Sequence, residues 1–301
     1  MRLFAALCAV FFLAVPVVAQ QQPDPEFNTS VENPAYKREG PRVAFDEAHH
    51  NFNTEGRYKP FVDLLMNDGY RLIRSRQPFS KTTLSSYKIL VISNALGAEE
   101  DDDEGADKSA FTDEEIQAVQ DFVKGGGSLL LIADHAPFGG AAAALASRFG
   151  VEMSNGYTFD KAHSGAEGPS HLVFSRENKL LGSHPITEGR GENERLNILQ
   201  SFTGQSLKGP PDSVAILKLS DAATDAPTYE SQTSVSAAGR AQAIALKFGK
   251  GRVLVQGEAT MLSAQISGPE KRQMGMNVPG NDNKQYVLNI MHWLSGLLKE
   301  K

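Results

Sequence analysis

The feature that most constrains the fold is a pair of uninterrupted apolar segments separated by one amphipathic pattern. Lys88–Ser93 (KILVIS) and Ser128–Asp134 (SLLLIAD) carry apolar residues without alternation, which predicts strands covered on both faces. Between them, Thr112 and Glu115 form a capping box that opens the helix DEEIQAVQDFVK, and glycines from Gly125 onward end it. Strand, helix and strand in this order predict a parallel βαβ unit.

The same alternation of strand and helix patterns extends along most of the chain. The further predicted elements are a strand at Arg42–Phe45, a helix at about Tyr58–Asn67, a strand at Tyr70–Arg74, a small-residue helix in GGAAAALASRFG, two strands joined by a Gly-Lys-Gly turn in Ala243–Ala259, and an amphipathic helix at Tyr286–Leu298. We therefore predict an α/β fold with a mostly parallel sheet and helices on both faces.

The amino-terminal segment predicts export. An early cation, an apolar stretch and a small residue at Ala19 give residues 1–19 the anatomy of a cleaved signal peptide, so we expect a periplasmic or secreted protein. Residues 20–40 are polar and proline-bearing and predict an extended leader. Residues 41–301 then form a single α/β domain, with an irregular insertion at about 151–235. We expect no transmembrane segment in the mature chain, because no later apolar stretch is long enough.

Composition excludes several classes of function. Cys8 is the only cysteine and lies within the predicted signal, so disulfides, cysteine nucleophiles and thiolate metal sites are excluded from the mature chain. The net charge is −6 and no basic stretch predicts nucleic-acid binding. The acidic run Glu99–Asp107 predicts a solvated loop, with calcium binding as the alternative, although EF-hand spacing is missing. No phosphate loop or dinucleotide fingerprint is present, so we expect no nucleotide cofactor.

Unusual polar residues follow the predicted strands, which predicts a site. The carboxyl ends of parallel strands open onto one crevice, where ligands bind in such sheets. The residues that we predict to be catalytic are Asp46, Glu47, His49, Asp134, His135 and Glu258, and those that we predict to bind substrate are His50, Asn51, Asn94, Gly139, Gly140 and Asn277. We expect Asp46, His49, Asp134, His135 and Glu258 to lie within about 10 Å of one another.

Each of these positions also has a structural interpretation. An acid at a strand end is often a turn former or a helix N-cap, and the adjacent His49 and His50 cannot both point into one pocket. Gly139 and Gly140 present amides to an oxyanion at the helix start, or allow the helix to pack tightly. Asn277 contacts ligand from a lid, or belongs to a solvated loop. Carboxylates with imidazoles suit acid–base catalysis or a divalent metal, but no metal-binding helix motif is present.

With these elements in place, a family resemblance can be recognised. The segments FDEAHHN, ILVISNALG, GGGSLLLIADHAPFGGAA, HPIT and GKGRVLVQGEATMLSAQ resemble the class I glutamine amidotransferase-like superfamily, and the chain is most similar to exported bacterial members with a domain of unknown function. The resemblance implies a three-layer, flavodoxin-like fold. In the amidotransferases, the turn after the fourth strand carries a cysteine nucleophile. Here Asp134 and His135 occupy that turn, which argues against glutamine hydrolysis.

Two functional hypotheses follow from the sequence. In the first, the protein is an exported hydrolase that acts on a small or carbohydrate-like envelope substrate through the acid and histidine cluster. In the second, it is a non-catalytic ligand-binding or scaffolding domain, as the resemblance to cysteine-free branches in gliding-motility and ciliary transport proteins implies. Fold alone does not choose between them.

Overall fold

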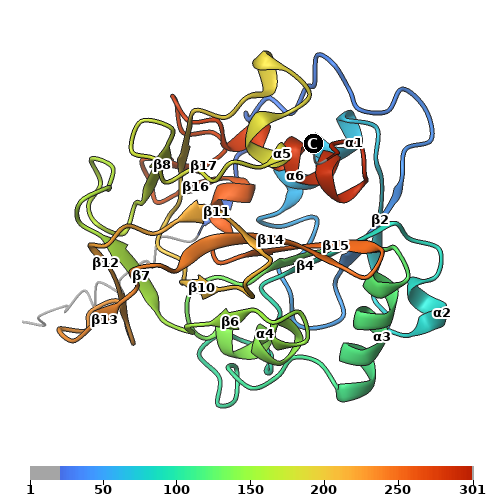
Figure 1. The fold of residues 1–301 in the computed structure, drawn as a ribbon, viewed down its shortest axis with the longest axis horizontal. Helices are drawn as coiled ribbons and strands as arrows, with labels where there is room; N and C mark the ends of the chain where they lie inside the picture. The colour runs from blue at the N-terminus through green and yellow to red at the C-terminus, as the bar shows by residue number, and fades with distance from the viewer. Residues whose placement is uncertain (1–20, 300–301) are drawn as a thin grey trace, which may run out of the picture.

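The computed structural model of the protein describes residues 21–299, so the predicted signal lies outside the described residues (Figure 1). A nine-stranded sheet runs through the centre, in the order β3-β2-β4-β5-β15-β14-β10-β6, with β11 also paired to β14. Its strands are β2 (Arg42–Asp46), β3 (Arg71–Ser75), β4 (Ile89–Ser93), β5 (Ser128–Ile132), β6 (Glu152–Met153), β10 (Leu207–Lys208), β11 (Val214–Lys218), β14 (Ala241–Phe248) and β15 (Gly251–Gln256).

The strands predicted to be parallel neighbours are parallel neighbours. In the series β3, β2, β4, β5, β15, every two neighbouring strands are parallel, and Leu129 of β5 lies opposite both Leu90 of β4 and Val253 of β15. The predicted hairpin is also confirmed, because β14 and β15 pair antiparallel across Gly249 and Lys250. The protein is therefore a mixed α/β structure with a large, mostly parallel central sheet.

Helices cover both faces of this sheet (Figure 1). α1 (Lys59–Asn67) and α6 (Asn283–Leu294) contribute to one hydrophobic cluster, and α2 (Lys81–Leu84), α3 (Asp113–Lys124) and α4 (Phe138–Ser147) contribute to the other. Strand side chains alternate between the clusters as the pleat requires: Leu130 and Ile132 face α1 and α6, whereas Leu129 and Leu131 face α3 and α4. This alternation decides which polar residues share a face at the strand ends.

The capping box and the final helix compare differently with their predictions. Thr112 caps α3 and Glu115 closes the box, as predicted. The last helix begins at Asn283 and ends at Leu294, earlier at both ends than predicted, and the chain turns at Gly296, whose φ is 89°. Glycine adopts this left-handed conformation without a steric cost, which explains why the helix does not continue to Leu298.

Smaller antiparallel sheets and short helices surround the central sheet. The region predicted to be irregular supplies β6, β10 and β11 to the main sheet, and most of the peripheral elements. The remaining elements are β1 (Gln22–Pro23), β7 (Tyr157–Asp160), β8 (Val173–Ser175), β9 (Ile198–Gln200), β12 (Ala223–Ala226), β13 (Val235–Ser236), β16 (Ala264–Ser267), β17 (Arg272–Gly275), α5 (Pro185–Glu188), η1 (Glu192–Glu194) and η2 (Thr260–Leu262).

The segment after residue 20 is extended and lies against the domain. β1 pairs with β16, the amide of Ala35 donates to Asp68 Oδ1, and Lys284 Nζ donates to the carbonyl oxygens of Asn28 and Ser30. Phe27, Val31 and Tyr36 pack on the α1–α6 cluster. Among residues 21–299, no helix combines the length and apolar character needed to cross a bilayer.

Candidate functional site

A cavity of about 670 Å³ lies beyond the carboxyl ends of β4 and β5. Three of the predicted site residues line it, namely Asn94, Asp134 and His135. Three charged or titratable side chains that the sequence did not assign to a site, Arg57, Asp101 and His171, also line it, together with aromatic rings that include Phe52, Phe138 and Tyr229. Its place at the strand ends agrees with the position of ligand sites in open α/β sheets.

The carboxyl group of Asp134 lines this cavity, and that of Glu258 lies buried near it. Glu258 is completely buried, and its carboxylate accepts hydrogen bonds from the amides of Thr260 and Met261 at 2.7 and 2.8 Å. Burial, and then the nearby charge of Asp134, raise the pKa of Glu258 well above its ordinary value, although the two amides act in the opposite direction. The protonated form of Glu258 is therefore favoured beside the Asp134 carboxylate, which lines the cavity.

Asn94 presents an unused hydrogen-bond donor at the cavity wall. Its φ of 50° lies in the left-handed region, which asparagine tolerates better than most residues. Its Oδ1 accepts the amide of Asp134 at 2.9 Å, which fixes the orientation of the side chain. Its Nδ2 is buried and has no hydrogen-bond partner within residues 21–299. Buried polar groups are nearly always paired, so this unpaired donor in a residue that lines the cavity is an exception in the described part of the chain.

His135 has one ring nitrogen engaged and the other open. Nδ1 lies 2.8 Å from the carbonyl oxygen of Ala136, which requires that Nδ1 carries the proton and leaves a lone pair on Nε2. The ring stacks on Tyr157 with centroids 4.4 Å apart and planes 18° from parallel, so its orientation is fixed. The imidazole is half-buried and lines the cavity, as a general base must.

Arg57 and His171 add polar groups that sequence reasoning missed. The Arg57 guanidinium lies 4.8 Å from the ring centroid of Phe52 and makes no side-chain hydrogen bond to the described part of the chain. Burial lowers the pKa of Arg57, and the charges of Asp101 and Asp134 partly offset this. Burial also lowers the pKa of His171, which favours a neutral imidazole. No local motif marks these residues, because they reach the cavity from loops.

Gly139 and Gly140 serve packing in this structure. A Cβ on Gly139 would lie 2.4 Å from Gln205 Oε1, and one on Gly140 would lie 2.6 Å from the carbonyl oxygen of Asp107. The amide of Gly140 donates to Asn155 Oδ1. Neither glycine lines the cavity, so the amides of this helix start do not form the predicted oxyanion site.

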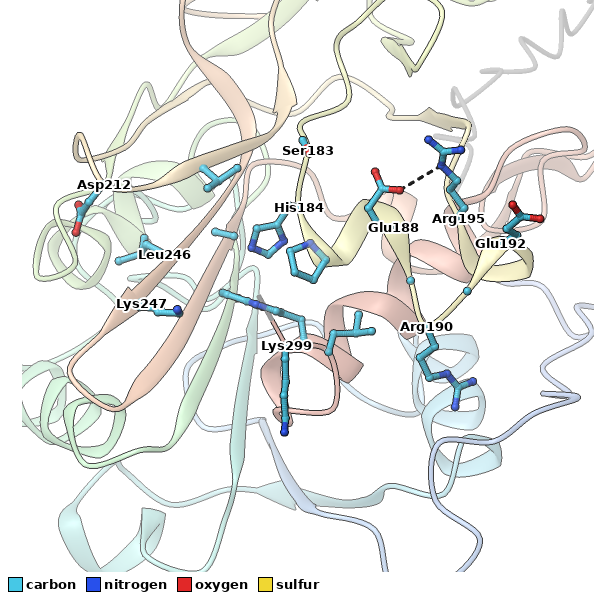
Figure 2. Close-up of a pocket in the computed structure, with 17 residues that line it drawn as sticks. Ser183, His184, Glu188, Arg190, Glu192, Arg195, Asp212, Leu246, Lys247 and Lys299 are labelled. Atoms are coloured by element: carbon cyan, nitrogen blue, oxygen red, sulfur yellow. Dashed lines mark ion pairs between the residues drawn. The ribbon is translucent and has the colours of Figure 1, made fainter. Parts of the chain in front are cut away.

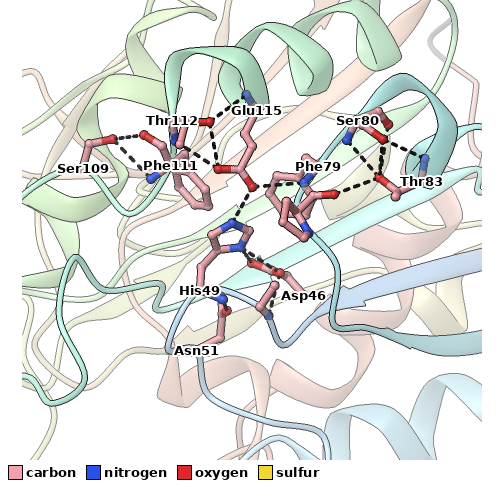
Figure 3. Close-up of polar contacts among 12 residues, drawn as sticks. Asp46, His49, Asn51, Phe79, Ser80, Thr83, Ser109, Phe111, Thr112 and Glu115 are labelled. Carbon is pink, nitrogen blue, oxygen red and sulfur yellow. Dashed lines mark hydrogen bonds and ion pairs between the residues drawn. The ribbon is translucent and has the colours of Figure 1, made fainter.

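Asp46 and His49 belong to a separate buried network (Figure 3). His49 Nδ1 lies 2.8 Å from Asp46 Oδ2, and Nε2 lies 2.8 Å from Glu115 Oε1. The imidazole contacts the rings of Phe79 and Phe111, with centroid distances of 4.7 and 4.8 Å, and the two phenyl rings also stack on each other. The hydrogen bonds of His49 therefore go to Asp46 and Glu115, and the prediction that Asp46 and His49 lie within about 10 Å of Asp134, His135 and Glu258 stays a prediction.

The period of the strands explains this separation. Asp46 follows Ala44 by two residues and therefore points to the α3 face of the sheet. Asp134 follows Ile132 by two residues, and Ile132 belongs to the α1–α6 face. The two carboxylates thus leave the same sheet edge on opposite sides.

The remaining predicted residues lie outside the cavity. Glu47 accepts the amide and hydroxyl of Thr54 and a hydrogen bond from Arg76, and it lines a shallow depression with His50 and Asn51. Asn277 holds the amino-terminal segment, because its Nδ2 donates to Asp24 and to the carbonyl oxygen of Gln265. Within residues 21–299, no three histidine, aspartate or glutamate side chains are grouped as a metal site requires.

A larger cavity of about 1010 Å³ lies beside α5 and the carboxyl end of α6 (Figure 2). Its wall includes Leu246 and Lys247, which pair with the first half of β15, so it lies toward the amino ends of the parallel strands. Two of its charged side chains pair with each other, Arg195 and Glu188 at 3.2 Å. His184 caps α5 by accepting the amide of Ile186. The smaller cavity, with its open imidazole nitrogen and unpaired amide, is the stronger candidate site.

Comparison with known proteins supports the fold but assigns no family. No protein-family model and no curated protein sequence matches the chain. Among solved structures, the chain is similar to one titled mmIFT52 N-terminal domain, with a TM-score of 0.59, 13% identity, and coverage of 84% of this chain and 97% of that one. Putative ThuA-like proteins from Bacteroides uniformis and Parabacteroides merdae match with TM-scores of 0.45 and 0.46, identities of 14% and 13%, coverage of 88% and 87% of this chain, and coverage of 93% of each of theirs.

Proposed function

We propose that the protein is an exported hydrolase that acts on a small or carbohydrate-like envelope substrate in the cavity at the strand ends. The observation that carries the proposal is the contact of His135 Nδ1 with the carbonyl oxygen of Ala136, in a side chain that lines the cavity. A neutral imidazole in this tautomer can accept a proton from water. The proposal includes a flavodoxin-like fold of the class I amidotransferase type. In that fold, His135 lies in the turn that carries the cysteine nucleophile of the amidotransferases.

The neighbouring groups fit that role. In the proposed reaction, His135 Nε2 takes a proton from a water molecule as the water oxygen attacks the scissile bond, and the same proton then passes to the leaving group. The Asp134 carboxylate, on the adjacent residue, favours the imidazolium that forms. The Nδ2 group of Asn94 donates a hydrogen bond to the oxygen on which negative charge develops.

Hydrolysis of a panel of glycosides, esters and amides tests the proposal, with wild-type protein compared with Asp134→Asn, His135→Gln and a control. General acid–base catalysis contributes about a hundredfold to ten-thousandfold, so each of the two site variants should lose that much of kcat/KM. Asp102→Asn is the control, because Asp102 is exposed on the same acidic loop as Asp101 and does not line the cavity. Activity that survives in both site variants contradicts the proposal.

A ligand-binding domain without catalysis is the second candidate. It is favoured by the complete burial of Glu258, which anchors the amides of Thr260 and Met261 and leaves Asp134 as the only carboxylate of that pair that lines the cavity. Calorimetry separates the two candidates. If the protein is a binding domain, calorimetry detects the heat of binding for a compound of the panel, and Asp134→Asn binds that compound more weakly. No product forms over prolonged incubation.

A further inference from the structure

The strand β7 has the reverse of the usual polarity. In its sequence Tyr157-Thr158-Phe159-Asp160, the polar residues point inward: Thr158 is 0% and Asp160 1% exposed, and Thr158 Oγ1 donates to Asp225 Oδ1 at 2.6 Å. The two aromatic residues therefore point outward and are only half-buried. Contiguous aromatic side chains on the outside of a strand are typical of a surface that binds a ligand or a partner.

A third ring connects this strand face to the candidate site. Tyr229 is 51% exposed, and its ring centroid lies 6.2 Å from that of Tyr157 and 5.5 Å from that of Phe159. Tyr229 also lines the cavity, and Tyr157 stacks on His135, which lines the cavity too. The rings of Tyr157, Phe159 and Tyr229, which we call the aromatic strip, therefore continue the cavity wall outward over the sheet of β7, β12 and β13.

The charges around the aromatic strip restrict what it can bind. Burial, and then the charges of Asp134, Glu230 and Asp101, raise the pKa of the Tyr157 phenol. Asp101 and Asp134 line the cavity beside the Arg57 guanidinium, and Glu230 adds a third carboxylate near Tyr157, so the negative charges outnumber the positive one and disfavour anionic chains. Sugar rings present an apolar C–H face to aromatic rings and hydroxyl groups to neighbouring polar atoms, so a neutral carbohydrate fits both the strip and the polar cavity floor.

We propose that the aromatic strip binds successive rings of a neutral oligosaccharide whose end lies in the cavity. This inference rests on the proposed function and narrows its substrate class from small carbohydrate-like molecules to neutral oligosaccharides. It predicts that affinity rises with chain length, because a single sugar unit occupies the cavity alone and only longer chains reach Phe159, which does not line the cavity.

Calorimetric titration with neutral oligosaccharides of increasing length tests the inference. The probes are gluco-, manno-, galacto- and N-acetylglucosamine oligomers, with oligouronates as the anionic comparison. We expect at least one neutral series to bind more tightly as it lengthens. Phe159→Ala should weaken the longest oligomer by about threefold to tenfold and leave the monomer unchanged, because Phe159 does not line the cavity. Tyr229→Ala should weaken the longest oligomer by a similar factor. Val235→Ala is the control, since Val235 is 68% exposed on β13, at the other edge of the sheet of β7, β12 and β13, and it should change neither.

Each other outcome contradicts the inference in a way that differs from failure of the hydrolase proposal. Affinity that does not depend on chain length, tighter binding of oligouronates, or equal loss of monomer binding in Phe159→Ala overturns the strip while leaving cavity hydrolysis intact. A dimer that Tyr229→Ala dissociates in sedimentation experiments also overturns it, because the strip is then a protein interface. Length-dependent binding without any product supports the strip and overturns the hydrolase.

Discussion

His49→Ala should destabilise the protein strongly and in a pH-dependent way. The substitution removes an imidazole that is 7% exposed and leaves two carboxylates without their shared partner, Asp46 at 0% exposure and Glu115 at 8%. Removing one partner of a buried ion pair costs about 3–5 kcal/mol, because the remaining charge stays buried. The substitution also opens a void beside the stacked rings of Phe79 and Phe111. We therefore expect a loss of about 3–5 kcal/mol in the free energy of unfolding near pH 5.5.

The direction of the pH dependence follows from two opposite pKa shifts. Burial lowers the pKa of His49, but its hydrogen bonds to Asp46 and Glu115 outweigh burial and raise it above 6.5. This stabilisation is complete below pH 6.5 and is lost as the pH rises through the raised value. Burial raises the pKa of Glu115, but hydrogen bonds from Thr112, His49 and Phe79 lower it below 4.5, so its stabilisation is lost as the pH falls through the lowered value.

The cost of His49→Ala should therefore be largest between pH 4.5 and 6.5 and smaller at about pH 9, where the wild-type imidazole is closer to neutral. Urea unfolding of wild type and variant at about pH 5.5 and pH 9 measures this difference. His50→Asn is the control, because His50 is exposed and its φ of 51° suits asparagine. A cost below about 1 kcal/mol, or the same cost at both pH values, would refute the assignment of a buried charged network.

Two further substitutions test the packing and the charges next to the cavity. Gly139→Ala should destabilise the protein by about 1–3 kcal/mol despite the better helix propensity of alanine, because its Cβ would meet the side chain of Gln205. That side chain is held by hydrogen bonds to the carbonyl oxygens of Ala133 and Asp134. Chemical unfolding measures the loss, and Gly191→Ala is the control that should be nearly neutral, because its Cβ would lie in open space. Asp134→Asn should be at least as stable as wild type at pH 7. Because the pKa of Glu258 is raised in the folded protein, wild type loses stability as the pH rises above 4.5. Asp134→Asn removes the contribution of the Asp134 charge to this raised pKa, so the variant should lose less stability as the pH rises. Unfolding free energies that fall equally with pH in both proteins contradict this prediction.

Local patterns predicted the central elements, and non-local pairing limited the rest. β4, β5 and α3 follow from continuous apolar runs and from the Thr112–Glu115 box, since burial on both faces and helix capping both leave local signals. β6 and β10 have only two residues each, and their pairing joins Leu207 to Met153 and Ala241. A strand of this length has no periodicity of its own, so its membership of the main sheet depends on contacts distant in the sequence.

The candidate site was predicted to the level of the sheet edge but not to the level of the face. Parallel strands bring Asp46 and Asp134 to one edge, which the sequence indicated correctly. Which face each carboxylate takes depends on where its strand ends relative to its neighbours, and a shift of one residue reverses the side. Asp46 is the last residue of β2, whereas Asp134 lies two residues beyond β5, and this offset is a property of the inter-strand register that no single strand reveals.

Glu115 shows how one local signal can hide a second role. Its place in the capping box is readable from Thr112 three residues earlier, and in the structure Oε2 accepts both the amide and the hydroxyl of Thr112. The other oxygen, Oε1, accepts from His49 and from the amide of Phe79, and so joins the start of α3 to the end of β2. A carboxylate has about four acceptor positions, and the cap uses only part of them. The free acceptor positions of Glu115 bind His49, which is therefore buried beside α3 and does not line the cavity. The sequence pattern had predicted that His49 belongs to the site.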